Sequence, residues 1–313
     1  MELIRGLHNL RPRHRGCVAT IGNFDGLHRG HRAVIGQLQR AAEAHGLPGT
    51  LITFEPLPLE YFLGERAPSR LSRLRDKVTL LRALGVERLL VLPFDRRLAE
   101  MPAEDFVRRV LVDGLGVRHL VVGDDFRFGK GRSGDFALLQ RAGAAHGFSV
   151  EDTETLADAG GRISSTRVRA ALAAGDFAAV QAMLGRPYTM GGHVIHGDKR
   201  GRQIGFHTAN IRVGRRVSPL RGVYAVTVEG AADAPLPGVC NIGRRPTIGG
   251  DSFLLEVHLL DFDGDLYGRH LEVHFRHHLR GERKFESLDA LVAQIHRDVA
   301  AAREFFRGNP DRG

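Results

Sequence analysis

The sequence of 313 residues contains no tryptophan, only two cysteines and no long apolar run. No stretch approaches the roughly 20 apolar residues that cross a bilayer, so we expect no membrane span. The first residues, Met1 to Arg5, lack the apolar stretch of a secretory signal, which makes the cytoplasm the expected location. Cys17 and Cys240 lie far apart, in predicted strands of different domains, which favours buried free thiols over a disulfide or a metal site.

The sequence also lacks a basic tail and any interleaving of basic with aromatic residues. A net charge of +9 would suit a nucleic-acid binder. The 45 lysines and arginines are dispersed along the chain, however, and single-strand binders place aromatic rings among their basic residues. A basic balance equally suits an enzyme whose ligands are polyphosphates. We therefore expect small-molecule partners and no specific nucleic acid, any DNA affinity being nonspecific.

The chain is long enough for two domains, and its first part alternates short apolar strands with amphipathic helices. This alternation, from about residue 15 to 182, predicts a parallel sheet covered on both faces. The predicted strands are Val18 to Ile21, Thr50 to Phe54, Arg88 to Leu92 and His119 to Val122, and the predicted helices are Arg32 to His45, Arg73 to Leu84, Ala103 to Leu115 and Asp135 to His146. Ligands bind such sheets beyond the carboxyl ends of the strands, where three polar segments are expected to converge. These segments are the glycine-rich stretch after Ile21, Glu55-Pro56 and Gly123-Asp124-Asp125.

The periodicity changes after Leu184. Later strands alternate apolar and polar residues with a period of two, as in Leu255 and Val257 on either side of Glu256. Several such strands separated by glycine-rich turns predict a small antiparallel barrel. A closing helix carries an apolar stripe expected to pack on the barrel: Leu288, Leu291, Val292, Ile295, Val299 and Phe306. We therefore predict two domains, residues 1–184 and 185–313.

The most informative segment is the glycine-rich stretch from Thr20 to His31, between the first strand and the first helix. Unpaired amides and the macrodipole at a helix start favour anions, and glycines permit close approach of a ligand to the backbone. The imidazoles of His28 and His31, spaced i and i+3, would face one phosphoryl group and stabilise charge as a phosphorus–oxygen bond breaks. This pattern favours nucleotidyl transfer, with a glycine-rich turn carrying two solvated histidines as the alternative.

The stretch resembles the Gly-x-Phe-Asp-Gly-x-His-x-Gly-His signature of the bacterial bifunctional riboflavin kinase/FMN adenylyltransferases, within the His-x-x-His nucleotidyltransferase superfamily. Further segments similar to that family follow in order: Thr53-Phe54-Glu55-Pro56, Gly123 to Gly129, Ile163 to Arg169, Thr208-Ala209-Asn210, Asn241 to Thr247 and Asp265-Leu266-Tyr267-Gly268. The resemblance covers nearly the whole chain. It implies an α/β protein with an N-terminal Rossmann-like nucleotidyltransferase domain and a C-terminal riboflavin kinase barrel with a terminal helix. The substrates and products it implies are riboflavin, FMN, FAD and ATP, with Mg²⁺.

For the adenylyltransferase site the resemblance implies contacts of His28 and His31 with the ATP phosphates. The FMN phosphate is already anionic near neutral pH, so this reaction needs positioning and charge neutralisation rather than a general base. Arg169 is expected to add a guanidinium at a helix start, and Ser165 is either a phosphate contact or a helix cap. The remaining expected ATP-binding residues are Gly22, Asn23, Phe24, Asp25, Gly30 and Thr166. The expected flavin-binding residues are Phe54, Asp125, Phe126, Arg127 and Phe128, because a flat heteroaromatic ring needs aromatic walls and a few polar edges.

For the kinase site the resemblance assigns Glu256 as the base that accepts the proton of the riboflavin hydroxyl, a neutral nucleophile. It assigns Thr208 and Asn210 to Mg²⁺ and ATP phosphate, since oxygen ligands together with phosphates suit that ion. Gly197 and Gly205 are expected to contact ATP, and the stretch from His196 to Arg202 resembles a flap over the nucleotide.

The chain departs from the family at two positions. Leu57 stands where many members have histidine, so no side-chain role carries over to that position. His207 stands where the family has proline before Thr208, and the loss of a residue with fixed φ should loosen the magnesium loop without removing a ligand.

Two alternatives stay open at this point. The first is a nucleotidyltransferase of the pantetheine-phosphate or nicotinate-nucleotide type with an unrelated C-terminal domain, which would not bind riboflavin there. The second is a non-enzymatic nucleic-acid-binding protein, which would show salt-sensitive affinity for DNA or RNA. We expect a monomer or a weak oligomer.

Overall fold

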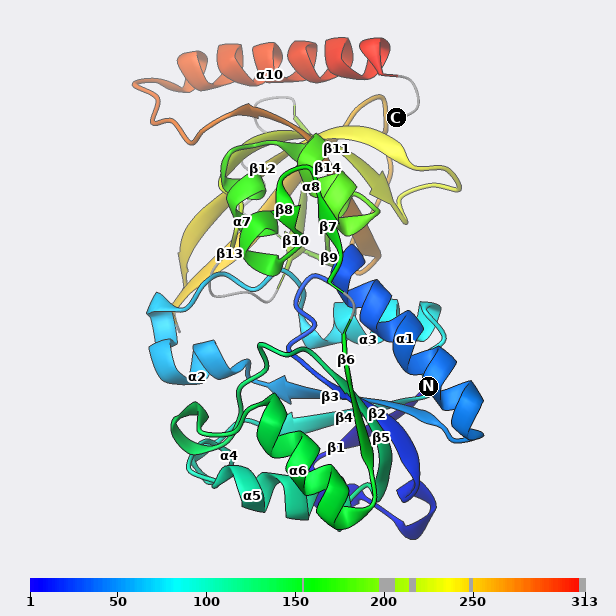
Figure 1. Cartoon of the computed structure of the whole chain (residues 1–313). Helices are drawn as coiled ribbons and strands as arrows, with labels where there is room; N and C mark the ends of the chain where they lie inside the picture. Colours follow the sequence, from blue (N-terminus) through cyan, green and yellow to red (C-terminus); the bar gives the residue numbers. More distant parts are fainter. Residues whose placement is uncertain (154, 197–205, 214–217, 248–249, 310–313) are drawn as a thin grey trace. The chain divides into compact units, whose positions relative to one another are not determined.

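The computed structural model describes residues 1–153, 155–196, 206–213, 218–247 and 250–309, without the side chains of 244–252. The chain forms two compact units, Met1–Ser165 and Thr166–Gly313. The first is an α/β sheet unit and the second a barrel (Figure 1). Among the described residues no helix is both long and apolar enough to cross a membrane.

The first unit contains a six-stranded sheet in the order β1-β4-β3-β2-β5-β6, and every pair in it is parallel. Its strands are β1 (Glu2–Arg5), β2 (Cys17–Ile21), β3 (Gly49–Glu55), β4 (Arg88–Pro93), β5 (Val117–Val122) and β6 (Ser149–Asp152). The four predicted strands are confirmed as β2 to β5. The sequence analysis did not predict the two edge strands, β1 and β6. In β1 only Ile4 is buried, and in β6 no residue is buried.

Helices cover both faces of this sheet, which explains the near-continuous apolar strands. On one face Leu51 of β3 packs with Ile35 of α1 (Arg29–His45) and Leu81 of α3 (Leu74–Ala83). The next residue along β3, Ile52, points to the other face and packs with Val110. The helices on that face are α5 (Ala103–Phe106), its π-helical continuation η4 (Val107–Val112) and α6 (Phe136–His146). The four predicted helices are therefore confirmed, one of them with a π-helical half.

Short elements fill the connections of the first unit. They are η1 (Leu7–Asn9), η2 (Pro12–His14), α2 (Pro58–Leu63), η3 (Gly64–Arg66), α4 (Arg96–Ala99), η5 (Lys130–Arg132) and the hairpin of β7 (Ala157–Asp158) and β8 (Gly161–Arg162). Cys17 and Cys240 are free and buried in strands of the two units, as predicted.

The second unit is a closed antiparallel barrel in the order β10-β13-β12-β11-β14-β9. Its strands are β9 (Tyr188–Ile195), β10 (Ala209–Arg212), β11 (Gly222–Glu229), β12 (Leu236–Thr247), β13 (Gly250–Leu259) and β14 (His270–Arg280). The predicted alternation is confirmed: Leu255 and Val257 are fully buried, while Glu256 lies on the opposite face of β13. The barrel follows from that alternation.

Among the described residues, the helices that accompany the barrel are α7 (Ser165–Ala173), α8 (Phe177–Leu184) and α10 (Leu288–Gly308). Phe177 packs its ring against Tyr224 and Phe275, at centroid distances of 5.7 and 6.4 Å. Residues 166–184 thus belong by contact to the second unit, although the periodicity places them in the first domain. The α10 stripe packs on the barrel through Val299 and Phe306, as predicted, whereas Leu288 at its start is exposed.

Candidate functional site

The two histidines of the glycine-rich stretch lie at the start of α1, as predicted. His28 is the N-cap residue, and its Nδ1 accepts a hydrogen bond from the backbone N–H of His31 at 3.3 Å. The two rings stack with centroids 3.6 Å apart. Because Nδ1 of His28 is an acceptor, its neutral ring carries the proton on Nε2.

The turn ahead of the histidines has unusual backbone geometry. Phe24, Gly26 and Leu27 all have positive φ angles, of 45°, 84° and 45°. Non-glycine residues seldom adopt such angles unless their surroundings hold them there. Asp25 helps to fix these angles. It is 3% exposed, and its carboxylate accepts hydrogen bonds from the backbone N–H groups of Leu71 and Ser72 at 2.9–3.0 Å. Asp25 therefore shapes the turn, as expected.

A cavity of about 460 Å³ opens beside this turn, at the carboxyl ends of β2 and β5. Its lining includes most of the predicted ATP-binding positions of the first unit: Gly22, Asn23, Phe24, His28, Gly30, His31 and Ser165. The predicted convergence of the first and third polar segments is thus confirmed. The second segment, which contains Glu55, was expected to converge there as well, but Glu55 is not among the described lining residues. Its carboxylate instead accepts a hydrogen bond from the Arg70 guanidinium at 2.9 Å.

Both imidazoles are held neutral. Burial lowers the pKa of His28 to about 4, an effect that Asp25 opposes and Arg162 reinforces. Burial, followed by the positive charges of neighbouring groups including Lys77, also places the pKa of His31 well below its ordinary value. Neutral rings at a helix start can donate hydrogen bonds to phosphate oxygens without first losing a proton.

The sequence analysis missed Arg162, which lines the cavity from β8. Its Nη1 donates to the carboxylate of Asp125, another lining residue, at 2.7 Å. Arg162 stands directly before the family-like segment Ile163 to Arg169, and that position was the only signal available in the sequence.

The predicted residues at the start of α7 separate into two groups. Ser165 is the first helical residue, and its hydroxyl donates to the backbone carbonyl of Asp25 at 2.9 Å. This hydroxyl thus ties Ser165, the last residue of the first unit, to the signature turn in addition to lining the cavity. Thr166 and Arg169 lie further along α7, in the second unit, and their contacts with ATP stay predictions.

Of the predicted flavin contacts, Asp125 and Phe126 line the cavity. Phe128 is buried and stacks on Phe126 with centroids 5.5 Å apart, so it supports that ring from behind. Arg127 is exposed and donates to the carbonyls of its own loop, and Phe54 belongs to the sheet core. Their flavin contacts stay predictions.

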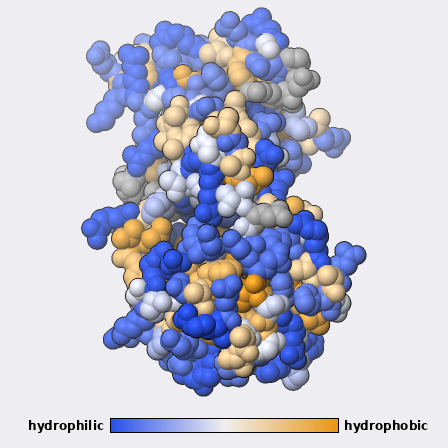
Figure 2. Space-filling model, viewed as in Figure 1, coloured by the Kyte–Doolittle hydropathy of each residue, from blue (hydrophilic) through white to orange (hydrophobic). Residues whose placement is uncertain are grey.

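Phe54 also touches an aromatic cluster that the sequence analysis did not single out. Phe94 packs against Phe54, Tyr61 and Phe62, with centroids 5.5–5.7 Å apart. Phe62 is 62% exposed, and Leu59, Tyr61 and Leu63 of α2 are exposed as well. Figure 2 shows this apolar patch over α2 at the left of the molecule.

In the barrel, three polar side chains from adjacent strands share one face. Glu256 of β13 is the cross-strand partner of both Asn210 and Asn241. The amide of Asn241 donates to the Glu256 carboxylate at 3.4 Å. The predicted base and one predicted magnesium ligand are therefore direct neighbours.

A second cavity, of about 400 Å³, lies at the end of the barrel beside this face. Thr208 and Asn210 line it, whereas Glu256 is absent from its described lining. His207 is exposed, its ring lies 3.6 Å from the Asp263 carboxylate, and its carbonyl accepts a hydrogen bond from His258. The other lining residues come from β9, β10, β13 and the loop after β13: Val194, Ala209, Val257, Leu259, Phe262, Asp263, Gly264, Asp265, Leu266 and Tyr267. Gly197, Gly205 and residues 197–202 of the predicted flap lie outside the described residues.

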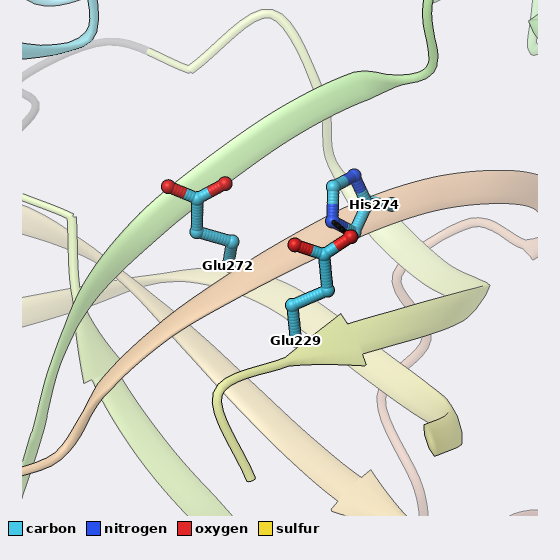
Figure 3. A group of neighbouring side chains, drawn as sticks. All are labelled: Glu229, Glu272 and His274. Carbon is cyan, nitrogen blue, oxygen red and sulfur yellow. Dashed lines mark ion pairs between the residues drawn. The ribbon is translucent and has the colours of Figure 1, made fainter. Parts of the chain in front are cut away.

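Within the described ranges one further group has metal-ligand character: Glu229, Glu272 and His274. Figure 3 shows Glu229 of β11 and His274 of β14 pointing toward each other, with the ring Nε2 3.1 Å from the carboxylate. The other ring nitrogen of His274 lies 3.0 Å from the Thr189 hydroxyl. Both nitrogens of this ring have polar neighbours on adjacent strands, and burial lowers the pKa of His274, so the ring pairs with Glu229 as an ion pair only when it is protonated. The group shares no residue with the predicted magnesium site.

The parallel sheet with histidines at a helix start, together with the separate closed barrel, defines a two-unit nucleotide-dependent transferase. Residues 10–167 match the FAD synthetase family, and residues 184–306 match the riboflavin kinase family. The chain is 53% identical over 307 residues to the bifunctional riboflavin kinase/FMN adenylyltransferase of Escherichia coli K12, with 98% of each chain covered. The protein of the same name from Pseudomonas fluorescens is 54% identical over 304 residues, with 97% of each chain covered.

The chain belongs to the family of bifunctional riboflavin kinase/FMN adenylyltransferases, which confirms the resemblance and both activities inferred from it. The riboflavin kinase match excludes the unrelated C-terminal domain of the first alternative. Among solved structures, one titled macrolide-efflux protein from Streptococcus pneumoniae is similar, with a TM-score of 0.80 and 28% identity over 97% of this chain and 99% of that one. Its similarity extends over both units.

Proposed function

We propose that the two reactions are divided between the two units. The cavity beside His28 and His31 transfers the adenylyl group of ATP to FMN, and the barrel face bearing Asn210 and Glu256 phosphorylates riboflavin. The observation that supports this division most strongly is that the cavity beside the two histidines and the face bearing Asn210 and Glu256 lie in different compact units.

In adenylyl transfer the FMN phosphate attacks the α-phosphorus of ATP and pyrophosphate leaves. The attacking oxygen is already anionic, so the protein has to align the two phosphates and offset their charge. Nε2–H of His28, the helix start and the guanidinium of Arg162 are donors suited to that role. The ring of Phe126, backed by Phe128, and the exposed aromatic cluster at α2 are surfaces suited to a flavin.

In riboflavin phosphorylation a neutral hydroxyl attacks the γ-phosphorus of ATP, and Glu256 is the carboxylate suited to accept its proton. The oxygens of Thr208 and Asn210 fit Mg²⁺, because hydroxyl and amide oxygens at the rim of one cavity are hard ligands that leave room for phosphates. A bound Mg²⁺ would offset the charge of the transferred phosphate. Asn241 orients the Glu256 carboxylate through its amide.

We further propose that the protein works in the cytoplasm as a monomer or weak oligomer, without a specific nucleic-acid partner. The test of the function is to incubate the purified protein with riboflavin, ATP and Mg²⁺ and to separate riboflavin, FMN and FAD over time. FMN should appear first and FAD should follow. If no FMN forms from riboflavin, the assignment of the kinase activity is wrong. If no FAD forms from supplied FMN, the assignment of the adenylyltransferase activity is wrong.

A further inference from the structure

Lys77 of α3 is a buried cation next to the signature turn. Its side chain lies in the interior of the sheet unit, where the residue is only 2% exposed. Lys77 is not among the described residues that line the cavity. Burying an ammonium group is costly unless hydrogen bonds and opposite charges compensate it. A methionine would fill similar space without that cost, so the contacts of the charged end need an explanation.

The ammonium group of Lys77 holds the turn by its backbone. Nζ donates to the carbonyl of Asn23 at 2.7 Å and to the hydroxyl of Thr53 at 3.2 Å. The Thr53 hydroxyl donates to the same Asn23 carbonyl at 3.3 Å. Asn23 directly precedes Phe24, the first residue of the turn with positive φ, so two buried donors fix the chain where its direction is unusual.

The charge of Lys77 also acts on the cavity. After burial, it is one of the positive charges that lower the pKa of His31. Burial lowers the pKa of Lys77 itself to about 8, a shift that the carboxylates of Asp25, Glu55 and Glu60 oppose and the guanidinium of Arg70 reinforces. The cation thus stands behind the helix start where the triphosphate is proposed to bind. A fixed charge of this kind needs no reorganisation during the reaction.

We propose that Lys77 is a positioning residue for adenylyl transfer, holding the Asn23 carbonyl so that His28 and His31 meet the ATP phosphates and adding positive potential behind them. This inference rests on the proposed function of the cavity. Lys77 itself touches no substrate, because its nitrogen is enclosed by the turn and β3.

The test is the Lys77→Met variant of the full chain, assayed separately for FAD formation from FMN and for FMN formation from riboflavin. Misplacement of reacting groups by about 1 Å costs roughly 100-fold in rate, so we expect kcat for FAD formation to fall by about 10- to 100-fold. The KM for FMN should change much less, and riboflavin phosphorylation should stay at the parent rate. Arg75→Met is the matched control, since it removes an exposed cation from the same helix and should leave both rates unchanged.

A folded Lys77→Met variant with the parent kcat for FAD formation would overturn the proposal, as would an equal loss in Arg75→Met. If Lys77→Met does not fold, Thr53→Val decides, because it keeps the ammonium group and the side-chain volume but removes one donor to Asn23. We expect a smaller fall in kcat for that variant, and an unchanged kcat would contradict the positioning role. His31→Ala separates the two proposals: if its FAD formation is unimpaired, the function assigned to the cavity itself fails.

Discussion

Acid should selectively weaken the sheet unit through His28. The residue is 5% exposed, and burial lowers its pKa from 6.5 to about 4. Since the folded pKa lies below the unfolded one, the unfolded chain binds the proton first as the pH falls. The stabilisation is complete above about pH 6.5 and is lost as the pH falls toward 4. Between pH 7 and pH 5 these values correspond to a loss of about 2 kcal/mol in the free energy of unfolding.

The matched variant is His28→Asn, because asparagine can still cap α1 by accepting the His31 N–H but does not titrate. Losing the stacked ring lowers its stability at every pH, so the informative quantity is the change between pH 7 and pH 5. Hydrogen exchange of amides in β2 and β5 measures it in the sheet unit alone, and the histidines that do not contact His28 cancel in the comparison. We expect the parent to lose about 2 kcal/mol more than the variant. Parallel losses in both proteins would refute the account of a buried, neutral His28.

Three further predictions concern the reactions themselves. His31→Ala should lower FAD formation by on the order of 100-fold while FMN formation persists, and assaying both rates on one preparation checks this. Glu256→Gln keeps the shape of the side chain, so riboflavin phosphorylation should fall by roughly 100- to 10,000-fold with adenylylation of supplied FMN unchanged; a variant that keeps most kinase activity excludes Glu256 as the base. His207→Pro keeps the carbonyl that His258 contacts and should tighten magnesium-ATP binding at the kinase site by about 0.4–1 kcal/mol, whereas weaker binding by a folded variant would show that the imidazole has a role of its own.

The fold was largely predictable because its signals are local. Apolar strands buried on both faces, such as β3 and β4, are continuous in sequence, and the barrel strands alternate clearly around Glu256. The edge strands β1 and β6 were missed because a strand with few buried residues leaves no apolar run. The packing of α8 on the barrel has no local signal in the sequence, since it depends on rings that meet only after folding, as Phe177 and Tyr224 do.

The sequence predicted only those residues of the candidate site that belong to a recognisable motif. The signature gave His28 and His31 and their position at a helix start, but not the groups that hold the turn in place. Those groups, Lys77 and the backbone of Leu71 and Ser72, lie about 50 residues away in sequence and carry no motif of their own. Asp25 shows the same limit, because its partners become visible only in the folded chain. Supporting contacts of this kind require the three-dimensional arrangement.

The central claim is that two independent sites perform consecutive reactions, and complementation between two full-length variants tests it most directly. On the time scale of the parent reaction, His31→Ala should convert riboflavin to FMN with little further conversion, and Glu256→Gln should convert supplied FMN to FAD with little conversion of riboflavin. Neither variant alone should make FAD from riboflavin, ATP and Mg²⁺, whereas an equimolar mixture should, because FMN released by one protein reaches the other. A mixture that accumulates FMN without FAD, or a single variant that completes both steps, would contradict the division of the chemistry between the two units.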